Sequence, residues 1–256
     1  MGLIKEAVRR LLPRGIKKHR ILTGRLRGMH IVTSWHDYPA AITGRTERPL
    51  LEWFDENVRA GETWLDVGAH YGYTALALSR LVGPTGRVVA FEPVLQTAGC
   101  LARTRLINDL SQLTVVSMGL AAPEELELRL LPLIRGMADT TLVQRPATVA
   151  GSEAIILAQL DWLWPHVSGG RSEIHGIKID VQGMEVEALQ GMSRILRMSR
   201  PKVVVELHNG VERSAVLAIL ASCGYESSGK PLEPIPGELK AQYVDDRSYA
   251  FSAAPY

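Results

Sequence analysis

The stretch TWLDVGAHYGYTALAL, residues 63–78, predicts a β-strand, a glycine turn and an α-helix in direct succession. The first five residues are mostly apolar, and the turn contains Gly68 and Gly72. Glycine permits a tight turn and a close approach of the backbone to a ligand, and the helix that follows offers free backbone N–H groups. The stretch has neither the Gly-Lys-Ser/Thr of a triphosphate loop nor the Gly-x-Gly-x-x-Gly of a pyrophosphate-binding turn, which argues against both classes.

Short apolar runs and helical segments alternate on both sides of this stretch. Runs rich in Val and Ile are typical of parallel strands covered on both faces, and their alternation with helices predicts a doubly wound α/β sheet with right-handed crossovers. The predicted strands are 63–67, 87–92, 113–119, 176–181 and 202–208 with a last strand in 243–255, and the predicted helices are 73–83, 95–109, 183–199 and 212–225.

Two regions break this rhythm. Residues 120–160 read as an insertion near the carboxyl ends of the strands, and the chain before residue 46 lacks the alternation. We therefore predict a basic N-terminal extension over 1–45 and one larger domain over 46–256. The local predictions are a helix over 3–12, a pair of short strands within 29–47, a helix over 47–61, a strand over 126–134, a turn-like segment over 135–151 and an extended run over 153–163.

Composition describes an ordinary globular chain. Of its 256 residues, 46% are hydrophobic and 22% are charged, which suffices for a sizeable core. The two cysteines, Cys100 and Cys223, are too few and too far apart for a zinc site or a disulfide framework, and both read as small buried residues. No apolar run approaches the roughly 20 residues that span a bilayer, and no secretory signal is visible, so we predict a cytoplasmic protein.

The net charge of +2 hides an asymmetry. Residues 1–28 contain nine Lys or Arg and one acid, so the rest of the chain is acidic overall. Such a lead segment could contact an anionic surface peripherally, although a solvated extension is the simpler interpretation.

Two acidic residues near the glycine turn indicate which kind of ligand it binds. Asp66 lies two residues before Gly68 and suits the cationic amino acid end of a ligand, directly or through water. Glu92 closes the second predicted strand, 24 residues after Gly68, where an acid can accept hydrogen bonds from both ribose hydroxyls of a nucleoside. Together, in this order on successive strands, they indicate S-adenosylmethionine.

The residues that carry a family resemblance follow the same order. DVGAHYGY (66–73) and VVAFEP (88–93) resemble the first two motifs of class I methyltransferases. Three further segments are similar to signatures of FkbM-type methyltransferases: AQLDWL (158–163), IKIDVQGMEVEALQGM (177–192) and RPKVVVELH (200–208). The resemblance extends over residues 44–210 and is specific to the family rather than to a substrate.

The resemblance implies a fold and a cofactor site. The fold would be a Rossmann-like, doubly wound, mostly parallel seven-stranded sheet with helices on both faces and an antiparallel last strand. Asp180 would lie where the methyl group meets the acceptor, at the end of the fourth strand, which is where open α/β sheets collect ligands. The remaining cofactor residues would be Asp66, Gly68, Ala69, His70, Tyr71 and Gly72 at the methionine part, Glu92 with Pro93 at the ribose, and Ser117, Met118 and Gly119 at the adenine.

Two positions depart from the family pattern. His70 stands where the family usually has Asn, and Gln182 where it usually has Glu. The glycine turn survives both changes, so cofactor binding is expected to persist. Gln182 removes a charge beside the expected reaction centre.

Methyl transfer to a hydroxyl needs alignment of the two reactants and removal of the hydroxyl proton. Asp180, Glu206 and His208 are the candidate bases. Glu206 and His208 are two residues apart on one strand and therefore point the same way. His208 is the first choice because its ordinary pKa lies near neutral pH.

A metal-assisted variant is an alternative that we do not favour. Asp180, Glu206 and Asn209 resemble the oxygen ligands of catechol-type O-methyltransferases and would suit Mg²⁺. No His-x-x-x-His spacing is present, which argues against zinc.

The sequence thus predicts an S-adenosylmethionine-dependent O-methyltransferase that acts on a hydroxyl of a small secondary metabolite or a sugar. The insertion, especially RGMADTT (135–141), and a loop with Trp35 and Tyr38 would shape the acceptor pocket. The alternatives are an N-methyltransferase or nucleic-acid methyltransferase, and a non-catalytic nucleoside-binding scaffold. No Asn/Asp-Pro-Pro-Tyr/Phe motif supports the nucleic-acid alternative. A homodimer is compatible with the sequence.

Overall fold

The structure is a computed structural model that describes residues 11–124, 126–134, 137–138, 152–236, 238 and 241–254. Residues 3–10 of the predicted helix and most of the segment 135–141 lie outside these residues, and residues 11 and 12 are not helical.

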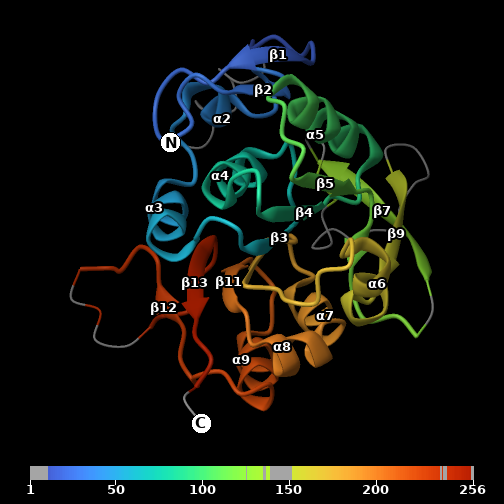
Figure 1. The fold of residues 1–256 in the computed structure, drawn as a ribbon, viewed down its shortest axis with the longest axis vertical. Coiled ribbons are helices and arrows are strands. Elements are labelled where there is room, and N and C mark those ends of the chain that lie inside the picture. The colour runs from blue at the N-terminus through green and yellow to red at the C-terminus, as the bar shows by residue number, and fades with distance from the viewer. Residues whose placement is uncertain are drawn as a thin grey trace.

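A seven-stranded sheet crosses the molecule (Figure 1). Its parallel strands are apolar on both faces, as expected for strands covered by helices on both sides. The order is β12–β13–β11–β10–β3–β4–β5, and β13 runs antiparallel to β11. The bounds are β3 (Thr63–Val67), β4 (Arg87–Phe91), β5 (Leu113–Val116), β10 (Gly176–Ile179), β11 (Lys202–Leu207), β12 (Lys230–Pro231) and β13 (Arg247–Phe251). The predicted fold class is confirmed.

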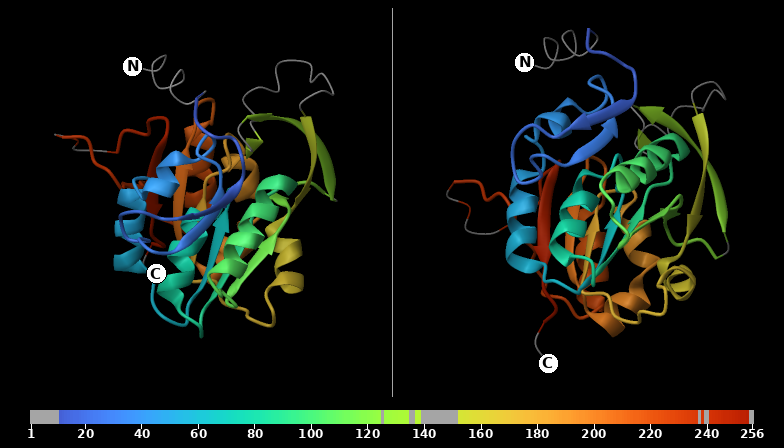
Figure 2. Two further views of the ribbon diagram at one scale, coloured as in Figure 1. Left: turned by 90° about the horizontal axis from the view of Figure 1, so that it is seen from above. Right: turned by 45° about the horizontal axis from the view of Figure 1, so that its top comes forward.

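Helices cover both faces of the sheet (Figure 2). Side chains alternate along each strand, so Trp64 belongs to one core and its neighbour Leu65 to the other. The first face carries α3 (Arg48–Asn57), α4 (Tyr73–Val82) and α5 (Leu95–Ile107), and the second carries α6 (Leu160–Val167), α7 (Glu185–Gln190), α8 (Ser193–Ser199) and α9 (Arg213–Ser222). The single helix predicted over 183–199 is thus two helices, α7 and α8.

The N-terminal region forms a small antiparallel pair, β1 (Lys17–Arg20) with β2 (His30–Thr33). It packs on α5, where the backbone N–H of Val32 donates to Oγ1 of Thr104 over 2.9 Å. The prediction of two strands within 29–47 was half right. The partner of β2 lies upstream, and α2 (Pro39–Thr43) begins at a proline, which favours a helix start. The boundary at residue 45 stays a prediction.

The insertion forms a second sheet in the order β6–β9–β7–β8. Its strands are β6 (Gly119–Leu120), β7 (Glu127–Ile134), β8 (Met137–Ala138) and β9 (Ser152–Ala158). The extended run predicted over 153–163 was wrong in its second half, because α6 begins at Leu160. There Leu160, Leu163 and Trp164 are buried at helical spacing.

No helix within the described ranges is both long and apolar enough to cross a membrane.

Candidate active site

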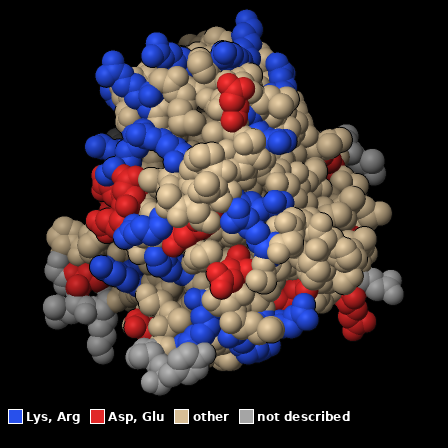
Figure 3. Space-filling model, in the orientation of Figure 1, with Lys and Arg blue, Asp and Glu red and all other residues tan. Residues whose placement is uncertain are grey.

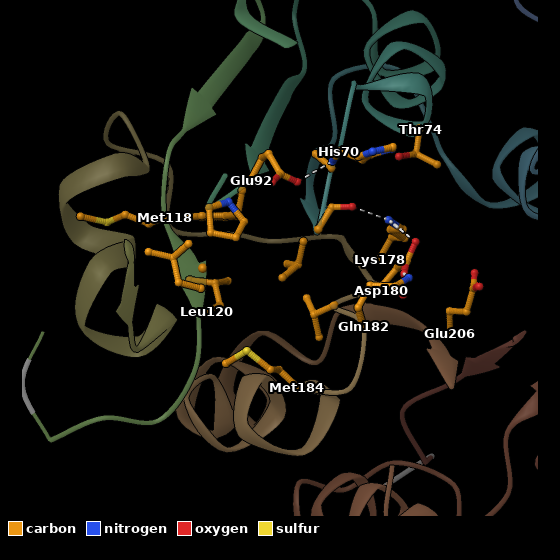
Figure 4. A pocket seen from close by; sticks show the side chains of 18 of the residues that line it. His70, Thr74, Glu92, Met118, Leu120, Lys178, Asp180, Gln182, Met184 and Glu206 are labelled. Carbon is orange, nitrogen blue, oxygen red and sulfur yellow. Dashed lines mark hydrogen bonds and ion pairs between the residues drawn. The ribbon is translucent and has the colours of Figure 1, made fainter. Parts of the chain in front are cut away.

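A cavity of about 270 Å³ lies at the carboxyl ends of β3, β4 and β10, beside the insertion. Parallel strands end at the same edge, so the side chains that follow them converge there. Figure 4 shows Glu92 and Met118 on one side of the cavity and Lys178, Asp180 and Glu206 on the other.

The turn after β3 is fixed by backbone geometry. Gly68 has φ +77°, and its N–H and that of Ala69 donate to the carbonyl of Phe91 over 3.0 and 2.9 Å. A Cβ on Gly68 would lie 1.7 Å from the carbonyl oxygen of Asp180, so only glycine fits between β3 and β10. Gly72 has φ +91° and fits against Leu101. Both glycines therefore serve chain packing as well as the turn.

Glu92 lies at the end of β4 and is 5% exposed. Its carboxylate accepts the backbone N–H of His70 over 2.8 Å and that of Val94 over 3.0 Å. Burial raises the pKa of Glu92 to about 7, although these two hydrogen bonds oppose the rise. The carboxylate is therefore fixed in direction and lines the cavity.

An apolar slot adjoins Glu92. Met118 and Gly119 follow β5, and Leu157 of the insertion packs against Gly119, where an added Cβ would lie 2.6 Å from its Cδ2. The slot is lined by Phe91, Pro93, Met118, Gly119, Leu120, Ile155 and Leu157.

Lys178 is the central cation of the site. Its side chain is 4% exposed, and its ammonium lies 3.3 Å from a carboxylate oxygen of Asp66 and 3.3 Å from one of Asp180. It also donates to the carbonyl of Gly68 over 3.0 Å. Burial would lower the pKa of Lys178, but the charges of Asp180 and Asp66 raise it above its ordinary value. Lys178 therefore stays charged and links the turn to β10.

Asp66 is fully buried beneath this lysine. Oγ1 of Thr74 donates to its carboxylate over 2.7 Å, and Asp66 does not line the cavity. In this structure the Asp66 side chain is therefore too deeply buried to contact the amino acid end of a ligand directly.

A second charge cluster follows β11. Nδ1 of His208 lies 2.7 Å from the fully buried carboxylate of Glu185, and Nε2 lies 3.4 Å from Asp180 and 3.7 Å from Glu206. Burial alone would lower the pKa of His208, but the hydrogen bond to Glu185 and the charge of Asp180 raise it to about 9. Burial, Asp180 and Glu47 raise the pKa of Glu206 to about 8.

Gln182 connects the two clusters. Its amide nitrogen lies 3.3 Å from Asp180, and its amide group lies 2.8 Å from Nε2 of His208. Both contacts use the same nitrogen of Gln182, which can donate to Nε2 of His208 only when that ring nitrogen carries no proton. Gln182 has φ +51°, and His70 has φ +49°.

The predicted site residues divide into two groups. Those that line the cavity are Gly68, Ala69, His70, Glu92, Pro93, Met118, Gly119, Asp180 and Glu206. Those that do not line it are Asp66, Tyr71, Gly72, Ser117, His208 and Asn209. Tyr71 is buried, with its hydroxyl 3.3 Å from Asp37, and Asn209 is exposed in the turn after β11. Of the two residues named on the early loop, Tyr38 lines the cavity and Trp35 does not.

Sequence reasoning missed five polar residues of the site, which are Asp37, Glu47, Thr74, Lys178 and Glu185. The sequence around Lys178 did indicate a role for it. A lysine between two isoleucines in an apolar strand is buried and therefore needs a partner of opposite charge. Glu185 lies in the signature that contains Asp180, three residues after Gln182. No motif near Glu47 in the sequence indicated that its side chain would line the cavity.

Of the three residues predicted as ligands of a metal ion, the structure brings two together, Asp180 and Glu206. Ligand atoms of Asp180, Glu206 and His208 lie within 4.8 Å of one another, with His208 in the place predicted for Asn209. The ammonium of Lys178 contacts Asp180, and the pKa of His208 is raised, so cationic groups already balance these acids. A resident divalent ion remains an unfavoured prediction.

Solved structures share this fold. The chain matches fibrillarin from Aeropyrum pernix, solved with natively bound S-adenosyl-L-methionine, at 14% identity and a TM-score of 0.51, over 93% of this chain and 83% of that one. An rRNA methylase from Streptococcus thermophilus matches at 11% identity and a TM-score of 0.51, over 83% and 99%. A methyltransferase FkbM from Methylobacillus flagellatus matches at 19% identity and a TM-score of 0.48, over 78% and 50%.

The sheet order and the place of the cavity at the strand ends define a Rossmann-like α/β fold, which these structures share. Residues 66–227 match the methyltransferase FkbM domain, and the chain belongs to the FkbM methyltransferase family. The predicted resemblance is thereby confirmed. A comparison with curated proteins finds no match.

Proposed function

We propose that the protein transfers the methyl group of S-adenosylmethionine to a hydroxyl oxygen of a small metabolite or a sugar. The observation that carries this proposal is the group of proton-binding side chains at one end of the cavity, Asp180 and Glu206, opposite Glu92 at the other. A hydroxyl acceptor loses a proton as it attacks, so it needs such a group, whereas the methyl donor needs an acid for its ribose.

The residues present fit the cofactor. Glu92 would accept the ribose hydroxyls, and the slot between Met118 and Leu157 would enclose the adenine. The turn from Gly68 to His70 would face the methionine part. Lys178 fixes this turn by donating a hydrogen bond to the carbonyl of Gly68. When bound, S-adenosylmethionine supplies an electrophilic methyl group on a sulfonium centre.

Proton removal would pass through Glu206. Its carboxylate lines the cavity, whereas His208 lies behind it and is held by Glu185. The acceptor hydroxyl would donate its proton to Glu206 when that carboxylate is ionised, and the charged imidazole of His208, 3.7 Å away, would favour the ionised form. The predicted order of bases is therefore changed: Glu206 touches the acceptor, and His208 acts through Glu206.

Two measurements test the proposal. Calorimetry with S-adenosylhomocysteine tests the cofactor site, and we expect binding to the wild type and to Glu206→Gln alike. Turnover by Glu206→Gln is expected to fall by about 10²–10⁴, the usual contribution of a general base. Full turnover by this variant would refute the role of Glu206, and absence of any binding would refute the cofactor site.

The nucleic-acid alternative has one supporting observation. Lys and Arg side chains gather over the end of the molecule where β1 and β2 lie (Figure 3), and Lys17, Lys18 and Arg20 of β1 are exposed. A methyl-transfer assay with radiolabelled cofactor on separated small-molecule and RNA fractions distinguishes the two. Label in RNA, lost when Lys17, Lys18 and Arg20 become Glu, would favour this alternative.

A further inference from the structure

Asp66 is not placed to meet the amino acid end of the cofactor. Its carboxylate is fully buried, contacts Lys178 and Thr74, and does not line the cavity. The methionine part of S-adenosylmethionine ends in an ammonium and a carboxylate. An ammonium that leaves water needs a carboxylate or aligned dipoles to replace its hydration. An acid that does line the cavity is therefore the better partner for this ammonium.

Five of the described carboxylates line the cavity, and four of them already have partners that hold them. The five are Asp37, Glu47, Glu92, Asp180 and Glu206. Cationic groups of Lys178 and His208 lie next to Asp180 and Glu206. The hydroxyl of Ser34 donates to Asp37 over 2.6 Å, and two backbone N–H groups donate to Glu92. Within the described part of the chain, the carboxylate of Glu47 accepts one hydrogen bond, of 3.3 Å from the Thr46 hydroxyl, and forms no ion pair.

The side chain of Glu47 does not support the helix that it precedes. Glu47 lies directly before α3, and its side chain makes no capping hydrogen bond to that helix. Its φ is +56°, in the left-handed region that residues other than glycine seldom adopt. Burial and the charge of Asp180 raise the pKa of Glu47, so its ionised form is unfavourable in the cofactor-free protein. A cation bound in the cavity would reduce this penalty.

Two tyrosine rings lie close to Glu47. Tyr38 and Tyr73 line the cavity with their ring centroids 6.3 Å apart. Burial and the charge of Glu47 raise the pKa of both hydroxyls. The charges of Asp180 and Lys178 also act on Glu47, which places it on their side of the cavity (Figure 4). Aromatic faces attract ammonium groups, so this corner of the cavity suits a small cation.

We propose that the carboxylate of Glu47 binds the ammonium of the methionine part of S-adenosylmethionine, next to the rings of Tyr38 and Tyr73. This role rests on the proposed cofactor site, in which Glu92 takes the ribose at the other end. Tyr73 opens α4 directly after the glycine turn, so the tyrosine rings adjoin the part of the chain that would face methionine. Glu47 precedes residues 66–227, which match the family domain, so a segment outside the matched range completes the site. The site is then selective for ligands with an intact amino acid end over nucleosides that lack it.

Calorimetry with two ligands that differ in the amino acid end tests this role. S-adenosylhomocysteine has the ammonium, whereas 5′-methylthioadenosine keeps the adenosine and the thioether but lacks the amino acid end. We expect the wild type to bind S-adenosylhomocysteine more tightly. Glu47→Gln is expected to weaken the binding of S-adenosylhomocysteine by about 10–100-fold, the usual contribution of a hydrogen bond to a charged group, and to leave that of 5′-methylthioadenosine unchanged. Glu92→Gln changes the ribose contact that both ligands share and is expected to weaken both.

Glu56→Gln is the matched control, because Glu56 is an exposed glutamate of α3, and it is expected to bind both ligands as the wild type does. Thermal unfolding without ligand verifies the fold. Glu47→Gln is expected to be at least as stable as the wild type, because it removes a buried carboxylate that has no cation. Unchanged affinity of Glu47→Gln for S-adenosylhomocysteine, or equal losses for both ligands, overturns the proposal. Binding of neither ligand to the wild type refutes the proposed cofactor site, and the role of Glu47 with it.

Discussion

Within the glycine turn, neighbouring residues adopt the same unusual backbone conformation for different reasons. Gly68 and His70 both have positive φ, at +77° and +49°. At Gly68 a side chain has no room, because the carbonyl of Asp180 occupies its place. At His70 a side chain fits, and the left-handed region is one that Asn and His tolerate better than most residues. The family's Asn and this chain's His therefore meet the same backbone requirement.

This difference predicts opposite results for two substitutions. Gly68→Ala is expected to lower the free energy of unfolding by about 3 kcal/mol or more, through left-handed strain and a steric clash. His70→Asn is expected to change it by less than about 1 kcal/mol, because it keeps the backbone N–H that donates to Glu92. Urea unfolding measures both. Equal loss in the two variants would contradict this interpretation of the turn.

The raised pKa of Glu92 leads us to expect that the affinity for the cofactor depends on pH. The ionised carboxylate accepts ribose hydroxyls better than the acid, and its pKa in the free protein is about 7. The affinity for S-adenosylhomocysteine is therefore expected to rise from pH 6 to pH 8. Glu92→Gln is expected to weaken binding by about 10–100-fold and to flatten this dependence, since hydrogen bonds to charged groups contribute about 1.5–3 kcal/mol.

Calorimetry across this pH range provides the measurement. Glu226→Gln, at an exposed position, is the matched control and should keep the wild-type profile. A wild-type profile in Glu92→Gln would remove Glu92 from the ribose site.

At the scale of elements, the buried lysine joins two strands and a turn. Lys178 of β10 is aligned with Asp66 of β3 in the parallel register, so the pairing of these strands brings the opposite charges together. Asp180, two residues further, points to the same side. The ion pairs thus follow directly from the strand register.

Removing the lysine charge is expected to destabilise the whole domain. Lys178→Met leaves the buried Asp66 without a cation and Asp180 with His208 alone, and an uncompensated buried charge costs about 3–5 kcal/mol. Adding Asp66→Asn to Lys178→Met is expected to restore part of this loss. Lys18→Met on exposed β1 is the control, with a change below about 0.5 kcal/mol. Chemical unfolding measures all three, and a neutral Lys178→Met would show that the acids do not depend on Lys178.

A contact between helices α6 and α8 gives Asp161, in the segment LDWL (160–163), a structural role. Asp161 in the first turn of α6 accepts the backbone N–H groups of Arg194 and Ile195 over 2.8 and 2.9 Å, and so caps α8 from another helix. Asp161→Ala is expected to lower the free energy of unfolding by about 1–2 kcal/mol, and Asp161→Asn by less. Thermal unfolding compares the two, and a larger loss in Asp161→Asn would contradict capping.

For the whole molecule, three raised pKa values predict how stability varies with pH. Glu92 rises from 4.5 to about 7, Glu206 from 4.5 to about 8, and His208 from 6.5 to about 9 in pKa. In each case the folded protein holds the proton more tightly than the unfolded chain, so stability falls as pH rises between the two values. The contribution of His208 is complete below pH 6.5 and is lost as pH rises through 9.

We therefore expect Tm of the cofactor-free protein to fall steadily from pH 5 to pH 9. Each kcal/mol of lost stability lowers Tm by about 2–4 °C for a chain of this size. The double variant Glu92→Gln with Glu206→Gln is expected to flatten the profile below pH 8. Scanning calorimetry at constant ionic strength measures it, and a Tm that rises toward pH 9 would contradict these pKa directions.

The strands of the central sheet were predictable because their environment is uniform. The run TWLDV forms β3 with the predicted bounds, since both faces are covered and every residue is buried. The run over 153–163 was not, because β9 and α6 are both apolar and the change between them depends on which neighbours bury them. Short apolar runs of this kind do not distinguish a strand from a buried helix.

The sequence by itself determined the family of this protein, because the order of its motifs resembles the FkbM methyltransferases and the match over residues 66–227 confirms that resemblance. Only the tertiary structure decided which of the predicted residues line the cavity and which lie behind it. Asp66 is covered by Lys178 and Thr74, and His208 is held by Glu185 behind Glu206. The physical reason is that burial and charge partners depend on strand register and helix packing, which bring together residues more than 100 positions apart, such as Asp66 and Lys178.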